Sequence, residues 1–265
     1  MTCGRVKVHS YQERTDEMKK LIFGVILILA GACILMGETG SNKAGKTRLF
    51  ILSGQSNMVH FDPAPTFEPA LQKAFPGDQI IVVKDAHVGQ PIRKWYKNFK
   101  VPEGWVPPVK GPTDGSPADL KGPTGGLYDV MMEKVKEATV NKKIDSITFV
   151  WMQGARDVFS GLSSIYEVNL QGLIKQLRDD MHRQDITMVV GRLSTAHKGE
   201  KDWDEVRAAQ VSACTKDPLA GWVDTDGLNG AAGTNMHYTH KGLLELGDRF
   251  AAKAIELINR QEKAH

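Results

Sequence analysis

Cysteine is scarce and net charge is small in this sequence of 265 residues. Its three cysteines, Cys3, Cys33 and Cys214, are too few for a disulfide framework, and we interpret Cys214 as a thiol of the core. The formal net charge of +3 comes from basic residues scattered among acids, which argues against a nucleic-acid partner. Hydrophobic content of 41% and charged content of 25% are ordinary for a globular protein. No internal repeat and no second domain can be recognised.

The longest apolar run is too short for an ordinary membrane span. It covers 16 residues, 21–36, whereas a membrane-spanning helix needs about 20. Lys19 and Lys20 precede the run, and the small residues Ala-Gly-Ala lie near its end. This order is typical of a secretory signal. We therefore expect residues 1–36 to be an N-terminal extension with a signal peptide, and the protein to be secreted or periplasmic.

Two details of this N-terminal region leave alternatives open. Met18 directly precedes the two lysines, so translation is expected to begin there. Cys33 follows Ala-Gly-Ala, which loosely resembles the cleavage box of a lipoprotein. A lipid on Cys33 is therefore an alternative and would be the only reason to expect a membrane partner. A third possibility is an apolar segment that stays uncleaved as an anchor.

Beyond a polar, Gly-rich linker at 37–47, the chain alternates between two kinds of pattern. Short apolar runs predict strands buried on both faces, as in a parallel sheet; they lie at 48–53, 78–85, 146–152, 185–191 and, more weakly, 221–226. Helical stripes lie between and after them, at 128–138, 166–181, 202–213 and 243–257, the second beginning near a cap at Ser163 and Ser164. This alternation predicts one domain over 48–265, a three-layer α/β/α sandwich with about five parallel strands. The segment 101–125 is rich in Pro and Gly, and such long loops are usually functional or disordered.

Two motifs suggest chemistry that their surroundings argue against. "GSNKAGKT" at 40–47 matches the phosphate-binding loop pattern, but that loop needs a strand before it and a helix after it. Here an apolar run precedes and a strand follows, so we interpret the segment as a linker. His237 and His240 are spaced like metal ligands but lack the third or fourth partner that zinc requires. We expect neither a metal nor an organic cofactor.

Ser56 raises a sharper question, because it follows the first predicted strand in "LFILSGQSNMVHF". The Gly-x-Ser-x-Gly elbow of lipase-type hydrolases is absent, since Met58 stands at the second glycine position. A serine hydroxyl is a weak nucleophile without a base to take its proton. Taken alone, this stretch favours an ordinary turn serine.

Residues far along the chain change that interpretation. Gln153 and Gly154 follow the third predicted strand, Gly89 follows the second, and His237 precedes the last helix. The carboxyl ends of parallel strands meet at one edge of a sheet, where open α/β folds place their ligands. A hydroxyl, an imidazole, a backbone N–H and a side-chain amide would converge there. Acyl transfer needs this set, an attacking group, a base and oxyanion donors.

Three blocks carry a family resemblance: "GQSNM", "WMQGARD" and a histidine before a Gly-containing C-terminal helix. Over residues 48–260 the chain resembles the SGNH hydrolases, and more closely the sialate O-acetylesterase-type carbohydrate esterases. The resemblance implies that Ser56 is the nucleophile and His237 the general base. It also implies that Ser56, Gly89 and Gln153 form the oxyanion hole, and that the substrate is an acetylated carbohydrate.

The sequence departs from the family pattern at two places. Family members usually carry an Asp two or three residues before the histidine, where this chain has Asn235 and Thr234. The candidates for the third triad member are therefore Asn235, Asp224, Asp226 and Asp157. Ala155 also stands where the family commonly has Glu. These departures keep a second hypothesis open, a catalytically weakened glycan-binding protein on the same fold.

Several further residues are candidates for contacting the sugar. His60 lies four residues after Ser56, and Arg156 lies beside the predicted donor Gln153. Arg93 and Trp95 follow the second strand, where the indole could stack on a sugar ring or belong to the core. The residues alone do not separate these alternatives.

Overall fold

The computed structural model describes residues 45–101, 122–230, 232–233 and 235–264. The expected signal region, Met18, Cys33 and most of the predicted linker lie outside these residues, as do Thr234 and positions 102–121 of the Pro/Gly-rich segment.

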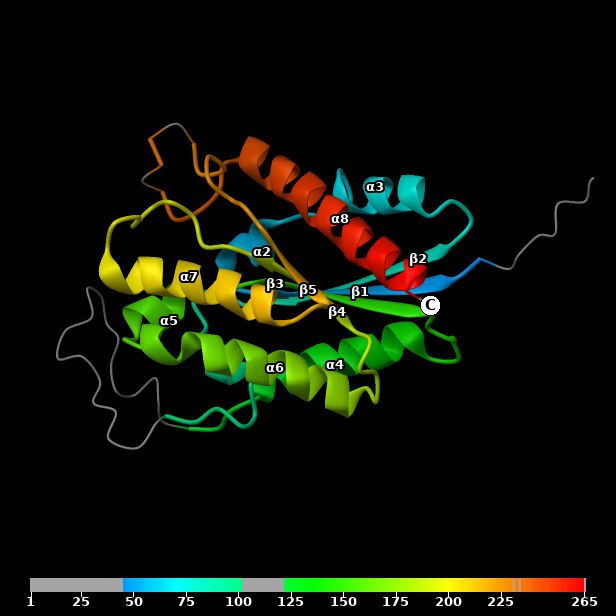
Figure 1. Ribbon diagram of the computed structural model, residues 1–265, viewed down its shortest axis with the longest axis horizontal. Coiled ribbons are helices and arrows are strands. Elements are labelled where there is room, and N and C mark those ends of the chain that lie inside the picture. The colour runs from blue at the N-terminus through cyan, green and yellow to red at the C-terminus, as the bar shows by residue number, and fades with distance from the viewer. Residues whose placement is uncertain (1–44, 102–121, 231, 234, 265) are drawn as a thin grey trace, which may run out of the picture. The chain divides into compact units, whose positions relative to one another are not determined.

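Five parallel strands form one sheet in the order β2-β1-β3-β4-β5. Their bounds are β1 Thr47–Gly54, β2 Gln79–Ala86, β3 Ser146–Met152, β4 Thr187–Gly191 and β5 Ala220–Val223. Helices flank the sheet on both sides (Figure 1). The predicted class, a three-layer α/β/α sandwich with about five parallel strands, is confirmed.

The apolar strands form because both of their faces are covered. Along β1, Leu49 and Ile51 belong to one buried cluster, whereas Phe50 and Leu52 belong to the other. Successive side chains of a strand point to opposite faces, so a continuous apolar run supplies both cores at once. This explains why the strands read as unbroken apolar runs instead of alternating patterns.

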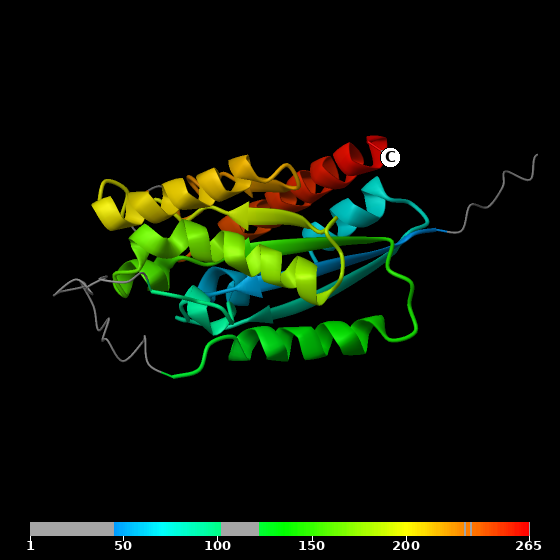
Figure 2. The same cartoon turned by 60° about the horizontal axis from the view of Figure 1, so that its bottom comes forward.

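Two groups of helices cover the two faces (Figures 1 and 2). The first face packs against α4 Gly126–Thr139, α6 Tyr166–Asp180 and α7 Lys201–Lys216, together with the short α5 Ala155–Phe159. The second packs against α3 Phe67–Ala74 and α8 His240–Lys263, together with the short α2 Ser56–His60. Two 3₁₀ turns, η1 Ile92–Lys94 and η3 Ser163–Ile165, complete the elements described here.

The helices that the sequence pattern missed are the short ones, α2, α3 and α5. Two of them have five residues each, too few to show a periodic apolar stripe. The predicted serine cap of α6 was wrong. Ser163 lies inside η3, and the residue that caps α6 is Ile165, without a side-chain hydrogen bond.

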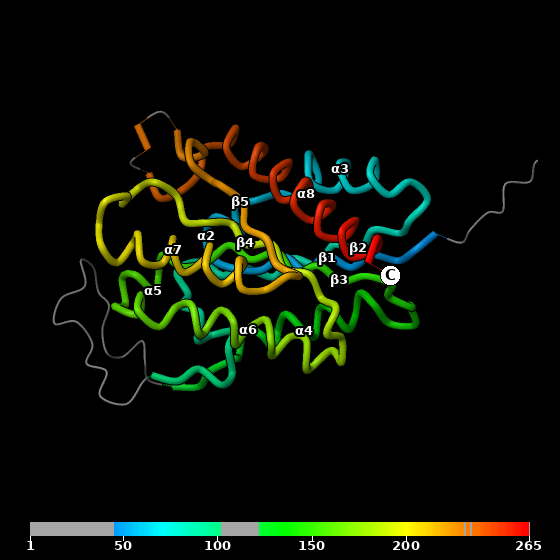
Figure 3. Tube along the Cα trace, in the orientation of Figure 1, coloured from blue at the N-terminus to red at the C-terminus, as the bar shows by residue number. Residues whose placement is uncertain are grey.

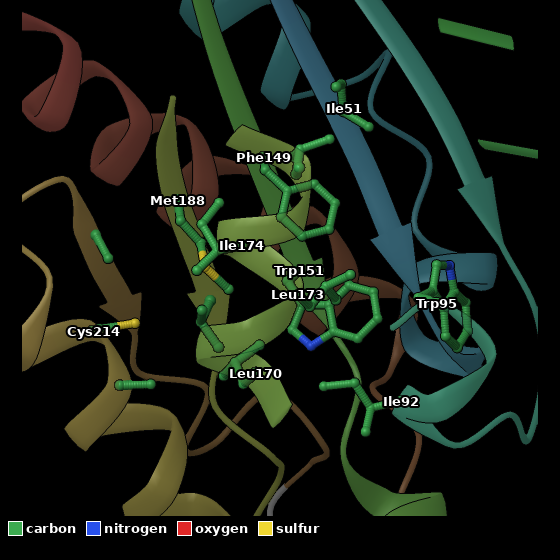
Figure 4. Close-up of a cluster of buried hydrophobic side chains, with 14 of the residues drawn as sticks. Ile51, Ile92, Trp95, Phe149, Trp151, Leu170, Leu173, Ile174, Met188 and Cys214 are labelled. Atoms are coloured by element: carbon green, nitrogen blue, oxygen red, sulfur yellow. The ribbon is translucent and has the colours of Figure 1, made fainter. Parts of the chain in front are cut away.

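Aromatic rings pack among aliphatic side chains in the first core, as Figure 4 shows. The Trp95 and Trp151 rings meet edge to face, with centroids 5.1 Å apart, and Phe149 lies 5.6 Å from Trp151. Cys214 is buried at the border of this cluster, which confirms its interpretation as a core thiol. Burial raises the pKa of its thiol to about 12, so it stays protonated and inert.

The order of the strands reverses direction at β1, inside the sheet. β1 connects to β2 on one side, and the chain then returns to β3 on the other side of β1. This reversal of strand order creates a crevice beyond the carboxyl ends of β1 and β3. The segment between β5 and α8 lies at the same end of the sheet as α2 (Figure 3). Among the described residues, no helix combines the length and the apolar character needed to cross a membrane.

Candidate active site

The turn after β1 delivers Ser56 to the crevice through a close approach of two backbones. Gly54 pairs with Met152 in the sheet and has a φ of 143°, a conformation that favours glycine. A Cβ at Gly54 would lie 2.1 Å from the carbonyl oxygen of Met152. The backbone N–H of Gln55 then donates to that oxygen at 2.8 Å. Ser56 follows as the first residue of α2.

Ser56 and His237 lie within hydrogen-bonding distance. The Nε2 atom of His237 is 3.0 Å from the Oγ atom of Ser56, although 181 positions separate the two residues. Ser56 is 6% exposed, so its hydroxyl is largely shielded from water but still reachable. The structure thus brings together the predicted nucleophile and the predicted base, in the relation that activation of a serine requires. Their chemical roles remain predictions.

Asn57 fastens the histidine loop to α2. Its Nδ2 donates to the carbonyl oxygen of Met236 at 3.1 Å, and its Oδ1 accepts from the backbone N–H of Tyr238 at 3.1 Å. The two bonds lie on either side of His237. Thr239 then caps α8 by accepting from the N–H of Gly242, which fixes where the loop ends.

The side chain of Gln55 joins the two loops that follow β1 and β3. Its Oε1 accepts from the N–H of Gly154 at 3.1 Å and from the N–H of Arg156 at 3.3 Å. These donors lie at the start of α5, where helical N–H groups have no partner within the helix. Gln55 therefore provides an acceptor for the free N–H groups at the start of α5 and holds this helix beside Ser56.

Asn235, one candidate for the third member, contacts the backbone of the histidine. Its Oδ1 accepts from the N–H of His237 at 2.9 Å. Asp224 and Asp226 instead bind Arg192, and Asp226 also binds Arg207 at 2.7 Å. Within the described part of the chain, none of the candidate carboxylates forms a hydrogen bond or an ion pair with the imidazole of His237.

Asp157 lies beneath the site and is fully shielded from water. It accepts from the N–H of Ile92 at 3.0 Å and from the Nε2 of Gln153. Burial raises the pKa of Asp157 to about 7, while these two hydrogen bonds act in the opposite direction. Asp157 therefore holds Gln153, which lines the same pocket as Ser56, and it forms no hydrogen bond with His237 in the described part of the chain.

The N–H groups of the Gln153 side chain, which we expected to face the oxyanion, are bound to other groups. Its Nε2 carries two N–H groups, and these bind Asp157 and the carbonyl oxygen of Gln90, the latter at 3.0 Å. Its Oε1 is buried and has no hydrogen-bond partner in the described part of the chain. In this geometry the amide donors are occupied and do not point at an oxyanion beside Ser56.

Gly89, the other predicted donor, lies in the turn after β2. Its φ of 66° is in the left-handed region, and the space where a side chain would begin is open. Ser56 itself offers a backbone N–H from the first turn of α2, which has no acceptor within the helix.

A pocket opens beside Ser56. Its lining combines the turn after β1 with α2, the end of β3 with the start of α5, the loop after β4, the start of α7 and the histidine loop: Gln55, Ser56, Asn57, Met152, Gln153, Ala155, Leu193, Ser194, Trp203 and Met236. The apolar members of this lining, Met152, Ala155, Leu193, Trp203 and Met236, offer a surface for a small acyl group.

The four candidate sugar-binding residues fall into two groups. His60 is exposed, and its ring meets that of His237 edge to face, with centroids 5.5 Å apart. Arg156 is partly exposed at the start of α5. Trp95 is fully buried against Trp151, and Arg93 is also buried and donates to the carbonyl oxygen of Gly122 at 2.7 Å.

The prediction that a sugar stacks on Trp95 is therefore wrong, because the indole is buried. The prediction that Arg93 contacts a sugar is wrong for the same reason. The alternative that Trp95 is a core aromatic is confirmed.

Sequence reasoning did not assign functions to Asn57 or Gln210. Gln210 accepts from the N–H of Leu193 and donates to the carbonyl oxygen of Gln153, both at 2.8 Å, which ties the loop after β3 to the loop after β4. Asn57 lies inside the quoted "GQSNM" block, so a signal for it was present. Nothing local marks Gln210, which lies in the middle of α7.

A family model matches most of the chain. Residues 59–256 match the family model described as "Carbohydrate esterase, sialic acid-specific acetylesterase", which is more than half of the chain. The chain belongs to this family. It is therefore a hydrolase that acts on esters, and the resemblance to SGNH-type carbohydrate esterases is confirmed. The comparison with curated proteins found no match.

Solved structures share the fold of this family member. A protein from Arabidopsis thaliana has a TM-score of 0.58 at 19% identity, and the match covers 79% of this chain and 97% of that one. A carbohydrate acetylesterase from Xanthomonas citri has a TM-score of 0.56 at 14% identity, covering 79% of this chain and 56% of the other. At these identities the likeness establishes the fold alone.

Proposed function

We propose that this carbohydrate esterase family member is a serine esterase that removes O-acetyl groups from sugars through Ser56 and His237. The observation that carries the proposal is the 3.0 Å distance between Ser56 Oγ and His237 Nε2, beside a small pocket. The description of the matching family supports an acetylated carbohydrate as the substrate class.

The first half of the reaction transfers the acetyl group to the enzyme. His237 Nε2 takes the proton of Ser56 as Oγ attacks the acetyl carbonyl carbon. The tetrahedral intermediate collapses when the bond to the sugar oxygen breaks, and His237 returns the proton to that oxygen. The products of this half are a free sugar hydroxyl and acetyl-Ser56.

The second half restores the enzyme. His237 takes a proton from a water molecule, whose oxygen attacks the acetyl carbon, and a second tetrahedral intermediate forms. Its collapse releases acetic acid, and the proton returns from His237 to Ser56 Oγ. Neither half of this scheme uses a metal or an organic cofactor.

The negative oxygen of both intermediates needs hydrogen-bond donors. The backbone N–H groups of Ser56 and Gly89 are the donors in this proposal. Gln153 can join them only if its amide leaves Asp157 and the Gln90 carbonyl, to which it is bound in this geometry. Its occupied donors suggest that it acts mainly by fixing the loop after β3.

The second hypothesis, a glycan-binding protein without efficient catalysis, is not favoured. It was motivated by the missing acid at 234–235, but the Ser56 and His237 side chains are in contact without one. We further propose that the enzyme acts outside the cytoplasm, because the segment at 21–36 resembles a secretory signal. Sequencing the N-terminus of the mature protein tests this location and any lipid on Cys33.

The experiment for the reaction is hydrolysis of p-nitrophenyl acetate and of an acetylated sugar. Ser56→Ala and His237→Ala should each lower kcat by about 10³-fold or more, because removing either partner abolishes activation of the nucleophile. A fluorophosphonate should label the wild-type protein at Ser56. Ser164→Ala, at an exposed serine of η3, is the matched control and should leave the rate unchanged. Full activity of a folded Ser56→Ala variant would contradict the proposal.

A further inference from the structure

The imidazole of His237 has few partners of its own. Its ring contacts Ser56 Oγ and lies edge to face against His60, and in the described part of the chain no carboxylate binds it. In most serine hydrolases an acid on the second ring nitrogen fixes the orientation of the base. Something else must hold the ring 3.0 Å from Ser56.

Asn57 is placed to do this through the main chain. Its side chain is 8% exposed and forms both of its bonds to the residues that flank His237, Met236 and Tyr238. Asn57 is also the residue after Ser56, in the same turn of α2. One side chain therefore fixes the backbone of the base relative to the backbone of the nucleophile.

The chemistry of the two bonds specifies an amide. One bond requires a donor and the other an acceptor, and asparagine carries both on a short side chain. An aspartate of the same shape keeps the acceptor and loses the donor to Met236. A leucine of similar size keeps neither.

Two more asparagines support the same loop. Asn229 donates its Nδ2 to the carbonyl oxygens of Gly233 and Asn235, at 2.7 and 2.8 Å. Asn235 Oδ1 accepts from the N–H of His237. The loop is therefore held by neutral amides, with Asn57 providing its link to α2.

We propose that Asn57 is a positioning residue, which clamps His237 against Ser56 through the backbone of Met236 and Tyr238. It performs by main-chain contacts the orienting part of the task that a carboxylate on the ring performs in other esterases. The inference rests on the proposed Ser56–His237 mechanism. Asn57 touches neither substrate nor the reacting atoms in this role, so its effect must pass through His237.

The test is the kinetics of Asn57→Leu and Asn57→Asp on p-nitrophenyl acetate. Small displacements of catalytic groups can cost about 10²-fold in rate. We expect Asn57→Leu to lower kcat by about 10- to 100-fold with KM changed less than about twofold, and Asn57→Asp to fall between it and the wild type. The rate of fluorophosphonate labelling should fall in parallel.

The decisive measurement repeats both substitutions in the His237→Ala background. If Asn57 acts only through His237, the residual rate of His237→Ala should not change when Asn57 is also replaced, because contacting residues in one unit are non-additive. A structural or substrate-binding role would lower the residual rate again and would overturn the inference.

A matched control shows what the loss of any buried asparagine does to the protein. Asn169 is 3% exposed and donates to the carbonyl oxygen of Ile165 at 2.8 Å, in α6. Asn169→Leu should lower the melting temperature without the selective loss of kcat. If Asn57→Leu does not fold, Asn57→Asp carries the same comparison.

The outcomes also separate this inference from the proposed function. Wild-type kcat in a folded Asn57→Leu or Asn57→Asp variant, with Ser56→Ala inactive, would overturn the clamp alone. An active Ser56→Ala variant would overturn the proposed function.

Discussion

At the scale of single residues, the buried carboxyl group of Asp157, next to the candidate active site, makes the free energy of unfolding depend on pH. Its carboxyl group lies in a fully enclosed position and accepts hydrogen bonds from the N–H groups of Ile92 and Gln153. Such an arrangement makes ionisation costly in the folded state. The pKa of Asp157 rises from 3.8 to about 7, a difference worth on the order of 4 kcal/mol.

This shift predicts how stability depends on pH. The folded state holds the Asp157 proton more tightly than the unfolded state, so this residue makes the free energy of unfolding fall as pH rises from about 4 to about 7. Above that range its full cost is present. Asp157→Asn cannot ionise and should show a flatter dependence.

Urea unfolding of the wild type and Asp157→Asn between pH 4 and 8 tests this prediction, because other ionisable groups contribute to both proteins alike. Parallel curves for the two proteins would show that Asp157 does not titrate in this range.

At the scale of elements, the junction of β1 with α2 depends on backbone contact. Gly54 combines a φ of 143° with a position where an added Cβ would lie 2.1 Å from the carbonyl oxygen of Met152. Lys84 then holds the end of α2, donating its Nζ to the carbonyl oxygens of Val59, at 3.0 Å, and Phe61. A charged donor at these carbonyls stabilises the last turn of a helix.

Replacing Gly54 should therefore be far more disruptive than replacing an ordinary turn glycine. Gly54→Ala would add backbone strain and a clash with backbone, and we expect it to lower the free energy of unfolding by at least about 3 kcal/mol. Gly77 is the matched control, since its φ is 86° but nothing lies within 4 Å of an added Cβ. Gly77→Ala should cost only about 1–2 kcal/mol. Equal losses in urea unfolding would refute the close-approach argument.

At the scale of the whole described domain, a cluster of buried charge lies at the end of the sheet opposite to Ser56. Arg48, at the start of β1, is buried and binds Asp78 at 2.6 Å and Glu262, near the end of α8, at 2.8 Å. Its guanidinium also lies 4.0 Å from the ring centre of Phe75. Ser56 lies after the other end of β1.

Arg48→Met should therefore affect unfolding and leave catalysis intact. Removing one partner of a buried ion pair typically costs about 3–5 kcal/mol, and the partial exposure of Glu262 places the expected loss at the lower end. Thermal melts should show a clear fall in midpoint, while kcat at 25 °C stays within about twofold of the wild type. Glu262→Gln, which keeps Arg48 paired with Asp78, should lose less. A selective loss of activity in Arg48→Met without loss of stability would contradict this separation.

The sequence by itself determined where the strands and long helices lie along the chain, because each apolar run or stripe is a local pattern with its own period. It also made Ser56 and His237 candidates, because "GQSNM" occurs together with "WMQGARD" and with a histidine before the last helix, and this combination resembles the family. Tertiary structure alone decided that these two side chains meet, that the Gln153 donors are occupied and that Trp95 is buried. These facts depend on contacts such as the one between positions 56 and 237, which no local pattern of side chains can encode.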